Sequence, residues 1–124
     1  MPNGPQIITD PVHFIQALGG LHDVWIERVT VDIERRSLEL STNDLNANFV
    51  GLPEDPGRRP CALLFLGVSR FFTSIDIKDG LVVSDAEVTH NDDGFEIAID
   101  LREGAANFAG RSIAFAFDGL AVVD

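Results

Sequence analysis

Apolar and polar residues alternate along most of this chain, in short runs separated by turn-forming residues. A period of two residues is typical of β-strands, because successive side chains point to opposite faces of a sheet. Short strands at close intervals favour antiparallel hairpins, so we predict a mainly β fold: an antiparallel β-sandwich, or a half-barrel. The predicted strands cover residues 23–33, 37–43, 61–68, 70–78, 81–90, 95–101, 111–117 and 120–123.

One segment near the start has the periodicity of a helix. Val12, Ile15 and Leu18 are spaced so that they fall on one helical face. Asp10 can cap the helix, and Pro11 suits the first helical position, where no backbone N–H donor is needed. The sequence therefore predicts one short N-terminal helix from Pro11 to Leu18, preceded by an extended leader.

The first long strand changes phase in its middle. Val24 and Ile26 alternate on one face, whereas Val29 and Val31 alternate on the other. One extra residue between positions 26 and 28 would bring both groups to the same side. The pattern indicates a β-bulge there, or a strand that is covered on both faces.

Two parts of the chain, residues 24–72 and 83–123, resemble each other. Self-similarity of this length indicates two copies of one β unit, so we expect an internal two-fold pseudo-repeat. The alternative is that two alternating β stretches share apolar residues by chance. The alignment pairs Val24 with Val83, Leu40 with Ile99, Ala47-Asn48-Phe49 with Ala106-Asn107-Phe108, Gly51 with Gly110 and, after a shift in offset, Leu63 with Phe115.

Length and composition favour a single folded domain over residues 1–124. The chain has 124 residues, 45% of them hydrophobic, with nine Phe, which suffices for a core of its own. It shows neither a signal peptide nor an apolar run long enough to span a bilayer, so we expect a cytoplasmic protein. The single cysteine, Cys61, cannot form an internal disulfide and is expected to be a buried, inert thiol.

The negative charge is large and unevenly distributed. The net charge is −11; residues 76–124 hold 11 acidic and 3 basic residues, against 9 and 6 in residues 1–75. Such a field repels nucleic-acid phosphates and anionic lipids, so neither nucleic acid nor a membrane is expected as a partner. A basic protein is the favoured partner.

The most acidic predicted hairpin lies within this second part. If residues 91–94 form its turn, like charges meet across the hairpin, at a cost of about 0.2–1 kcal/mol per pair. A face that tolerates this cost is predicted to bind a cationic partner; the alternative is a solvated face that keeps the protein soluble and blocks edge pairing. The expected pairs are Asp85 with Asp100, Glu87 with Ala98 and His90 with Phe95, with Glu96 on the same face as the acidic residues.

His22 and Asp23 are the strongest candidates for catalysis. Adjacent residues on a strand point to opposite faces, so they cannot orient each other as a catalytic dyad, and no serine or cysteine nucleophile stands beside them. We therefore interpret both as structural. Asp10, His13 and His22 lack the spacing of a metal site, so no catalytic residue, metal or cofactor is predicted. Trp25 is expected to be a core residue rather than a binding anchor.

A series of short motifs resembles the immunity protein 50 family and related small bacterial domains with a Leu/Phe-His-Asp motif. The resemblance spans about residues 12–120 and departs from the family at residues 46–60 and 71–77. It implies a non-enzymatic, β-rich protein that is encoded beside a toxin and neutralises it by direct binding, with no assigned role for His22 and Asp23. The motifs are Gly19-Gly20-Leu21-His22-Asp23, Val29-Thr30-Val31-Asp32, residues 63–68, Gly80-Leu81-Val82-Val83, Phe95-Glu96-Ile97 and residues 108–113.

These observations predict a non-enzymatic, acidic protein-binding domain, with immunity to a basic toxin as its specific form. The alternative is a small-molecule-binding or enzymatic domain whose site lies near His22, Asp23 and the loop 44–60, which is rich in proline and glycine. A purely structural domain is the third possibility. Either the strand at 70–78 or the terminal strand at 120–123 could expose an edge that dimerises.

Overall fold

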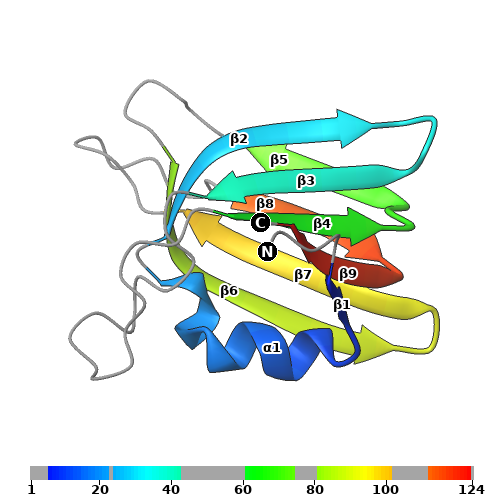
Figure 1. Cartoon of the computed structure of the whole chain (residues 1–124), viewed down its shortest axis with the longest axis horizontal. Helices are drawn as coiled ribbons and strands as arrows, with labels where there is room; N and C mark the ends of the chain where they lie inside the picture. The colour runs from blue at the N-terminus through cyan, green and yellow to red at the C-terminus, as the bar shows by residue number, and fades with distance from the viewer. Residues whose placement is uncertain (1–5, 23, 43–60, 75–80, 102–111, 124) are drawn as a thin grey trace.

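The computed structural model describes residues 6–22, 24–42, 61–74, 81–101 and 112–123. It is mainly antiparallel β with one short α-helix, as predicted (Figure 1). In chain order the elements are β1 (Gln6–Ile8), α1 (Pro11–Ala17), the 3-10 helix η1 (Gly19–Leu21), β2 (Trp25–Asp32), β3 (Ser37–Thr42), β4 (Cys61–Leu66), β5 (Arg70–Ser74), β6 (Leu81–Asn91), β7 (Gly94–Leu101), β8 (Ser112–Phe117) and β9 (Gly119–Val123). No helix among the described residues has the length and apolar character needed to cross a membrane.

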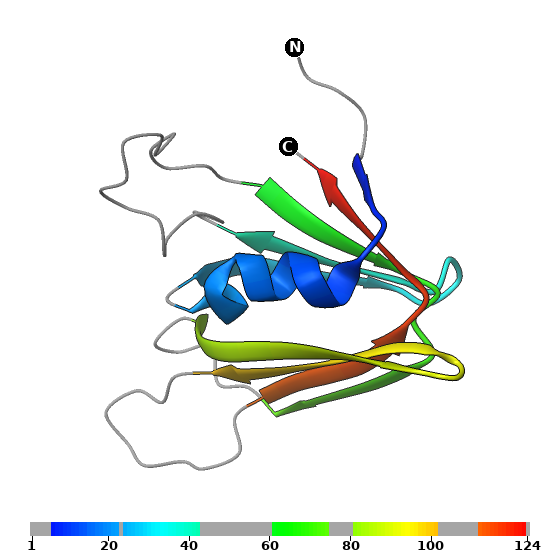
Figure 2. The same ribbon diagram turned by 90° about the horizontal axis from the view of Figure 1, so that it is seen from below.

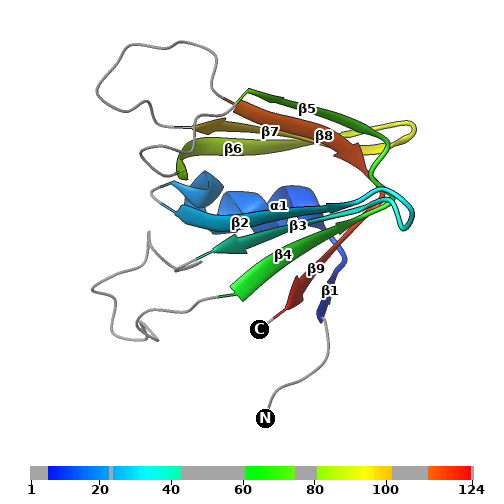
Figure 3. The same ribbon diagram turned by 90° about the horizontal axis from the view of Figure 1, so that it is seen from above.

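The described strands form one sheet in the order β1-β9-β4-β3-β2-β6-β7-β8-β5, and this sheet is not closed into a barrel. It folds where β2 meets β6, because these two strands share only the pairs Trp25 with Val82 and Ile26 with Leu81. The first layer consists of β1, β9, β4, β3 and β2, and the second of β6, β7, β8 and β5. Figures 2 and 3 show the layers facing each other, with α1 between them along one open side.

The strand order has an approximate two-fold symmetry about the contact of β2 with β6. Counting outward, β3, β4 and β9 follow β2, whereas β7, β8 and β5 follow β6. Thus β5 follows β4 in the chain but pairs with β8, and β9 follows β8 but pairs with β4. Backbone hydrogen bonds join the two crossings: Asp118 N donates to Leu66 O at 2.8 Å, and Ser69 N donates to Ala116 O at 3.1 Å. Each half therefore gives its last strand to the other layer.

The ladder corrects one part of the internal alignment. Leu63 pairs with Leu40, and Ile113 pairs with Ile99. Because Leu40 and Ile99 are equivalent in the alignment, the counterpart of Leu63 is Ile113 and not Phe115. A slip of two residues keeps every side chain on its own face, so alternation in the sequence does not detect it. The aligned segments 47–51 and 106–110 lie outside the described residues.

Helix α1 begins as predicted. Asp10 caps it, since the Asp10 Oδ1 atom accepts a hydrogen bond of 3.0 Å from the His13 backbone N–H, and Pro11 is the first helical residue. The helix ends at Ala17, and Leu18 is its C-cap. Ile15 is fully buried, so α1 contributes directly to the core.

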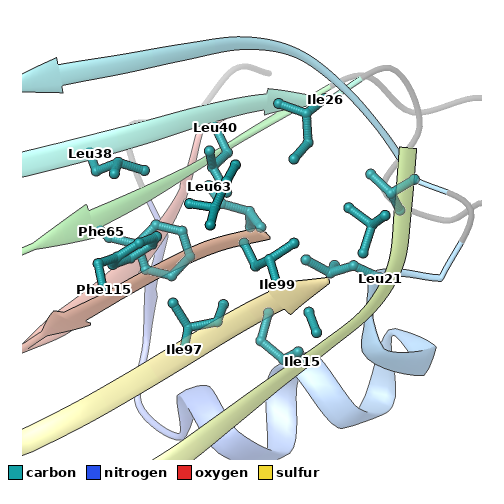
Figure 4. Close-up of a cluster of buried hydrophobic side chains, with 14 of the residues drawn as sticks. Ile15, Leu21, Ile26, Leu38, Leu40, Leu63, Phe65, Ile97, Ile99 and Phe115 are labelled. Carbon is teal, nitrogen blue, oxygen red and sulfur yellow. The ribbon is translucent and has the colours of Figure 1, made fainter. Parts of the chain in front are cut away.

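The core lies between the two layers and beneath α1. In Figure 4, Ile15 and Leu21 point from the N-terminal helices toward Ile97 and Ile99 of β7. Phe65 of β4 is fully buried and lies beside Phe115 of β8, so the two layers meet at these rings. Burial alternates along the strands, most regularly in β3 and β8, as the two-residue period predicted.

Two details of the predicted strands differ from the structure. The β-bulge is confirmed, because the register of β2 shifts between Ile26 and Arg28. Residues 6–8, however, form β1 instead of a plain leader, and β1 pairs with β9. Three residues are too few for alternation to identify a strand. As a result β9 pairs on both sides, with β1 and β4, so the expectation that the terminal strand exposes an edge is wrong.

Gly67 lies where the chain leaves β4 to cross between the layers. Its φ of 67° is a conformation that favours glycine. A Cβ atom at this position would lie 2.8 Å from the Cβ of Asp118, closer than van der Waals contact allows. We expect Gly67→Ala to lower the free energy of unfolding by about 2 kcal/mol, measured by urea denaturation.

Gly119, at the other crossing, provides a matched control. A Cβ atom there would meet its nearest atoms in Leu66 at 3.9 Å, an ordinary contact. Gly119→Ala should therefore change the free energy of unfolding by less than about 1 kcal/mol. If both variants lowered the free energy of unfolding equally, the positive φ of Gly67 and its close approach to Asp118 would not explain the loss.

Candidate protein-binding face

The hairpin of β6 and β7 has the predicted register. Asp85 pairs with Asp100, Glu87 with Ala98 and His90 with Phe95. The strands extend to Asn91 and Gly94, which pair with each other, and a register shift lies between Val83 and Asp85. The like-charged pair expected from the sequence is therefore present in the ladder.

All four candidate carboxylates lie on the outer face of the second layer. The residues that alternate with them, among them Ala86 and Ile99, point into the core and are buried. The side chains of Asp85, Glu87, Glu96 and Asp100 are exposed, and none of them forms an ion pair with another described residue. The second layer thus presents a solvent-exposed acidic surface.

The four carboxylates do not all belong to one cavity. Glu87 and Glu96 line a shallow trough of about 200 Å³ on the outer face, whereas Asp85 and Asp100 lie farther along the hairpin. Asp85 approaches η1: a Cβ atom on Gly20 would lie 2.5 Å from its Oδ1 atom. The structure therefore singles out Glu87 and Glu96 as the carboxylates best placed to act together.

The rest of the trough comes from β5 and β8. Arg70 and Phe72 of β5 line it opposite the carboxylates, and Ala98, Ala114 and Ala116 line it between them. Because alanine side chains are small, they leave the middle of the face hollow between the longer side chains. The trough therefore combines two acids, one guanidinium and one exposed aromatic ring.

The contributions of β5 and β8 to the trough were not predicted from the sequence. Arg70 and Phe72 reach the trough only because β5 crosses to the second layer and pairs with β8. The small residues Ala114 and Ala116 are a signal that was visible in the sequence, since they alternate with the buried residues of β8. Nothing in the sequence placed that strand beside β5.

The end of the hairpin orients one trough carboxylate. The Asn91 side-chain amide donates a hydrogen bond of 3.0 Å to Glu96 Oε1. The Oδ1 atom of Asn91 accepts a hydrogen bond of 2.9 Å from the backbone N–H of Asp93. These two bonds restrict the Glu96 side chain and reduce the conformational entropy that it would lose on binding.

His22 lies away from the trough, where η1 leads into β2. Its Nδ1 atom is 2.7 Å from the carbonyl oxygen of Ser84 in β6. A carbonyl only accepts, so the ring nitrogen donates, and the bond ties the chain after η1 to β6. Asp23 and the predicted loop at 44–60 lie outside the described residues.

Asp10, His13 and His22 do not form a metal site; among the described residues no group of three potential ligands converges.

The expectation that Trp25 is a core residue is wrong, because its side chain is 48% exposed. Its neighbours Val24 and Ile26 point inward, so alternation turns Trp25 outward. The side chain of Cys61 lies outside the described part of the chain.

Comparisons with protein-family models, with curated proteins and with solved structures gave no match to this chain. The similarity to the immunity protein 50 family therefore stays a prediction that rests on short motifs.

Proposed function

We propose that this chain is a non-catalytic binding protein that uses the outer face of its second layer to bind a basic protein. The observation that supports the proposal is the trough between Glu87 and Glu96 on one side and Phe72 on the other. Two carboxylates without an ion-pair partner among the described residues, next to an exposed ring, form a site for a cationic side chain.

A lysine or arginine of the partner would lie along the trough. Its charged end would contact Glu87 and Glu96, and its aliphatic part would cover the alanine floor. The exposed ring of Phe72, at the other side of the trough, would pack against the aliphatic part of that side chain. Arginine suits the site better than lysine, because its planar guanidinium can donate two hydrogen bonds to a carboxylate.

Arg70 gives the trough a direction. Arg70 belongs to the same strand as Phe72, and its positive charge would repel a second cation near it. An acidic or carbonyl group of the partner suits that end. The expected recognition segment therefore has a cation at the carboxylate end and a hydrogen-bond acceptor at the other.

The net charge of −11 would act over longer distances. A strongly acidic protein attracts a basic one before contact, which raises the association rate at low ionic strength. Added salt screens this attraction, so binding should weaken as salt is added. The specific form of the proposal, which the family resemblance implies, is neutralisation of a basic toxin in the cytoplasm.

The test is capture of binding proteins from cell lysate at low and at high salt, followed by titration of the captured protein against two variants. We expect the trough variant Glu87→Lys/Glu96→Lys to bind about a hundredfold more weakly, because each reversal should cost about 1.4 kcal/mol or more. The affinity is measured by isothermal titration calorimetry.

The matched control is Glu27→Lys/Glu39→Lys, which changes the net charge by the same amount on the first layer. It should lower the affinity only slightly, through weaker long-range attraction. Equal losses in the two variants would mean that net charge alone drives binding, and retention of no basic protein at low salt would contradict the proposal.

A further inference from the structure

The described sheet has two edge strands, β1 and β5, and the approximate symmetry makes these two edges unequal. Strand β9 pairs with β4 on one side and with β1 on the other. Its counterpart β5 pairs with β8 alone among the described strands and ends the sheet. The position beside β5 corresponds to the one that β1 occupies beside β9, and no other described strand occupies it.

The surface next to this edge is apolar. A groove of about 410 Å³ lies between the end of β2 and the start of β5, lined by Val31, Ile33, Val68 and Phe71 together with polar residues. Ile33 is 84% exposed and Val31 is 41% exposed. On the opposite open side of the sandwich, α1 and β1 cover the corresponding region (Figures 2 and 3).

Strand β5 offers an apolar side chain on each face. Phe71 turns inward, with its ring centroid 6.4 Å from that of Phe115, and also lines the groove. Phe72 turns to the outer face and is 70% exposed. An unpaired edge that carries two phenylalanines is a template for pairing with another strand.

We propose that β5 pairs antiparallel with β5 of a second copy of this chain, forming a symmetric dimer with one continuous outer face. Centred on Phe72, this register places the two Phe72 rings opposite each other, a favourable aromatic cross-strand pair. Arg70, the only charged residue of β5, does not face itself in this register. In this register the inward Phe71 of each copy pairs with Thr73 of the other copy, on the side of the sheet that faces the first layer.

The other end of the sheet is a poorer surface for dimerisation. Strand β1 has three residues, against five in β5, and its exposed apolar side chain is Ile7 alone. Because two five-residue strands form a small interface, the dimer is expected to be weak, with a dissociation constant in the micromolar range.

The dependence on salt distinguishes dimerisation from binding of the proposed basic partner. Both copies carry a net charge of −11, so they repel each other, and screening by salt should strengthen the dimer. Binding of a basic protein should instead weaken as salt is added. Failure of one proposal therefore leaves the other testable.

Sedimentation velocity over a range of protein concentrations tests the dimer. We expect a reversible dimer that is strengthened by salt and weakened about tenfold or more by Phe72→Lys, which places two like charges opposite each other. Ile7→Lys, the same change at the other edge, should have no effect. Circular dichroism checks that both variants remain folded, since both side chains are exposed.

Cross-linking tests the register directly. Residues opposite each other on antiparallel strands have Cα atoms about 4.5–5.5 Å apart, within the range of a disulfide. Under a mild oxidant, Phe72→Cys should therefore form covalent dimers and Ile7→Cys should not. A monomer at all concentrations, or a dimer that Ile7→Lys abolishes and Phe72→Lys leaves unchanged, would overturn the proposal.

Discussion

Phe65→Ala is expected to lower the free energy of unfolding by about 4 kcal/mol, which is the usual cost of removing a fully buried phenylalanine. Phe65 is 0% exposed and belongs to the core cluster. Its ring makes edge-on contacts with two rings of β8: the centroid of Phe115 is 4.7 Å away and that of Phe117 is 4.9 Å away. Truncation would remove both contacts and leave a cavity between the layers.

Urea denaturation of the wild type, Phe65→Ala and Phe65→Leu measures this effect. The leucine variant keeps most of the buried volume, so it should lose about 1.5 kcal/mol, with an unchanged dependence on urea. Phe65 is in β4 and its ring partners are in β8, so the loss reports the contact between the two halves. A loss below about 1 kcal/mol for Phe65→Ala would contradict the packing described for the core.

Ile15→Asp is expected to cost more than about 4 kcal/mol and to leave little native protein, because an unpaired carboxylate would replace a fully buried side chain. Ile15 is 0% exposed and is the residue that anchors α1 over β6 and β7. An alanine at this position would lose apolar area and leave a cavity, at a cost of about 2–4 kcal/mol.

The control is Gln16→Asp on the exposed side of the same helix. It adds the same charge without burial, so its effect on unfolding should stay within about 0.5 kcal/mol. Near-ultraviolet circular dichroism and thermal unfolding follow both variants. A stable, cooperatively folding Ile15→Asp protein would mean that α1 does not close the open side of the sandwich.

The β6–β7 hairpin was predictable because all its information is local. Alternation identified which residues point inward, the acidic and glycine-containing turn set the end of the strands, and counting back from it gave the pair of Asp85 with Asp100. The cap of α1 and the bulge in β2 were predictable for the same reason. Each depends on residues within a few positions of one another.

The trough was only half predictable. Glu87 and Glu96 belong to the hairpin and were identified as candidates, whereas Arg70 and Phe72 come from a strand that is distant in the sequence. Which strand lies beside β8 depends on the crossing of β5 and β9 between the layers. The sequence has no local mark of that exchange, because a strand with one buried face satisfies its pattern in either layer.

By itself, the sequence determined the fold class, most strand positions, the helix with its cap and the acidic face, because each depends on periodicity or on the chemistry of near neighbours. Only the tertiary structure decided the exchange of β5 and β9, the role of residues 6–8 as a strand, the exposure of Trp25 and the position of β5 at one end of the described sheet. These features depend on which surfaces remain uncovered once all layers have packed. Which surfaces are covered depends on packing between segments that are far apart in the sequence, so no local pattern predicts it.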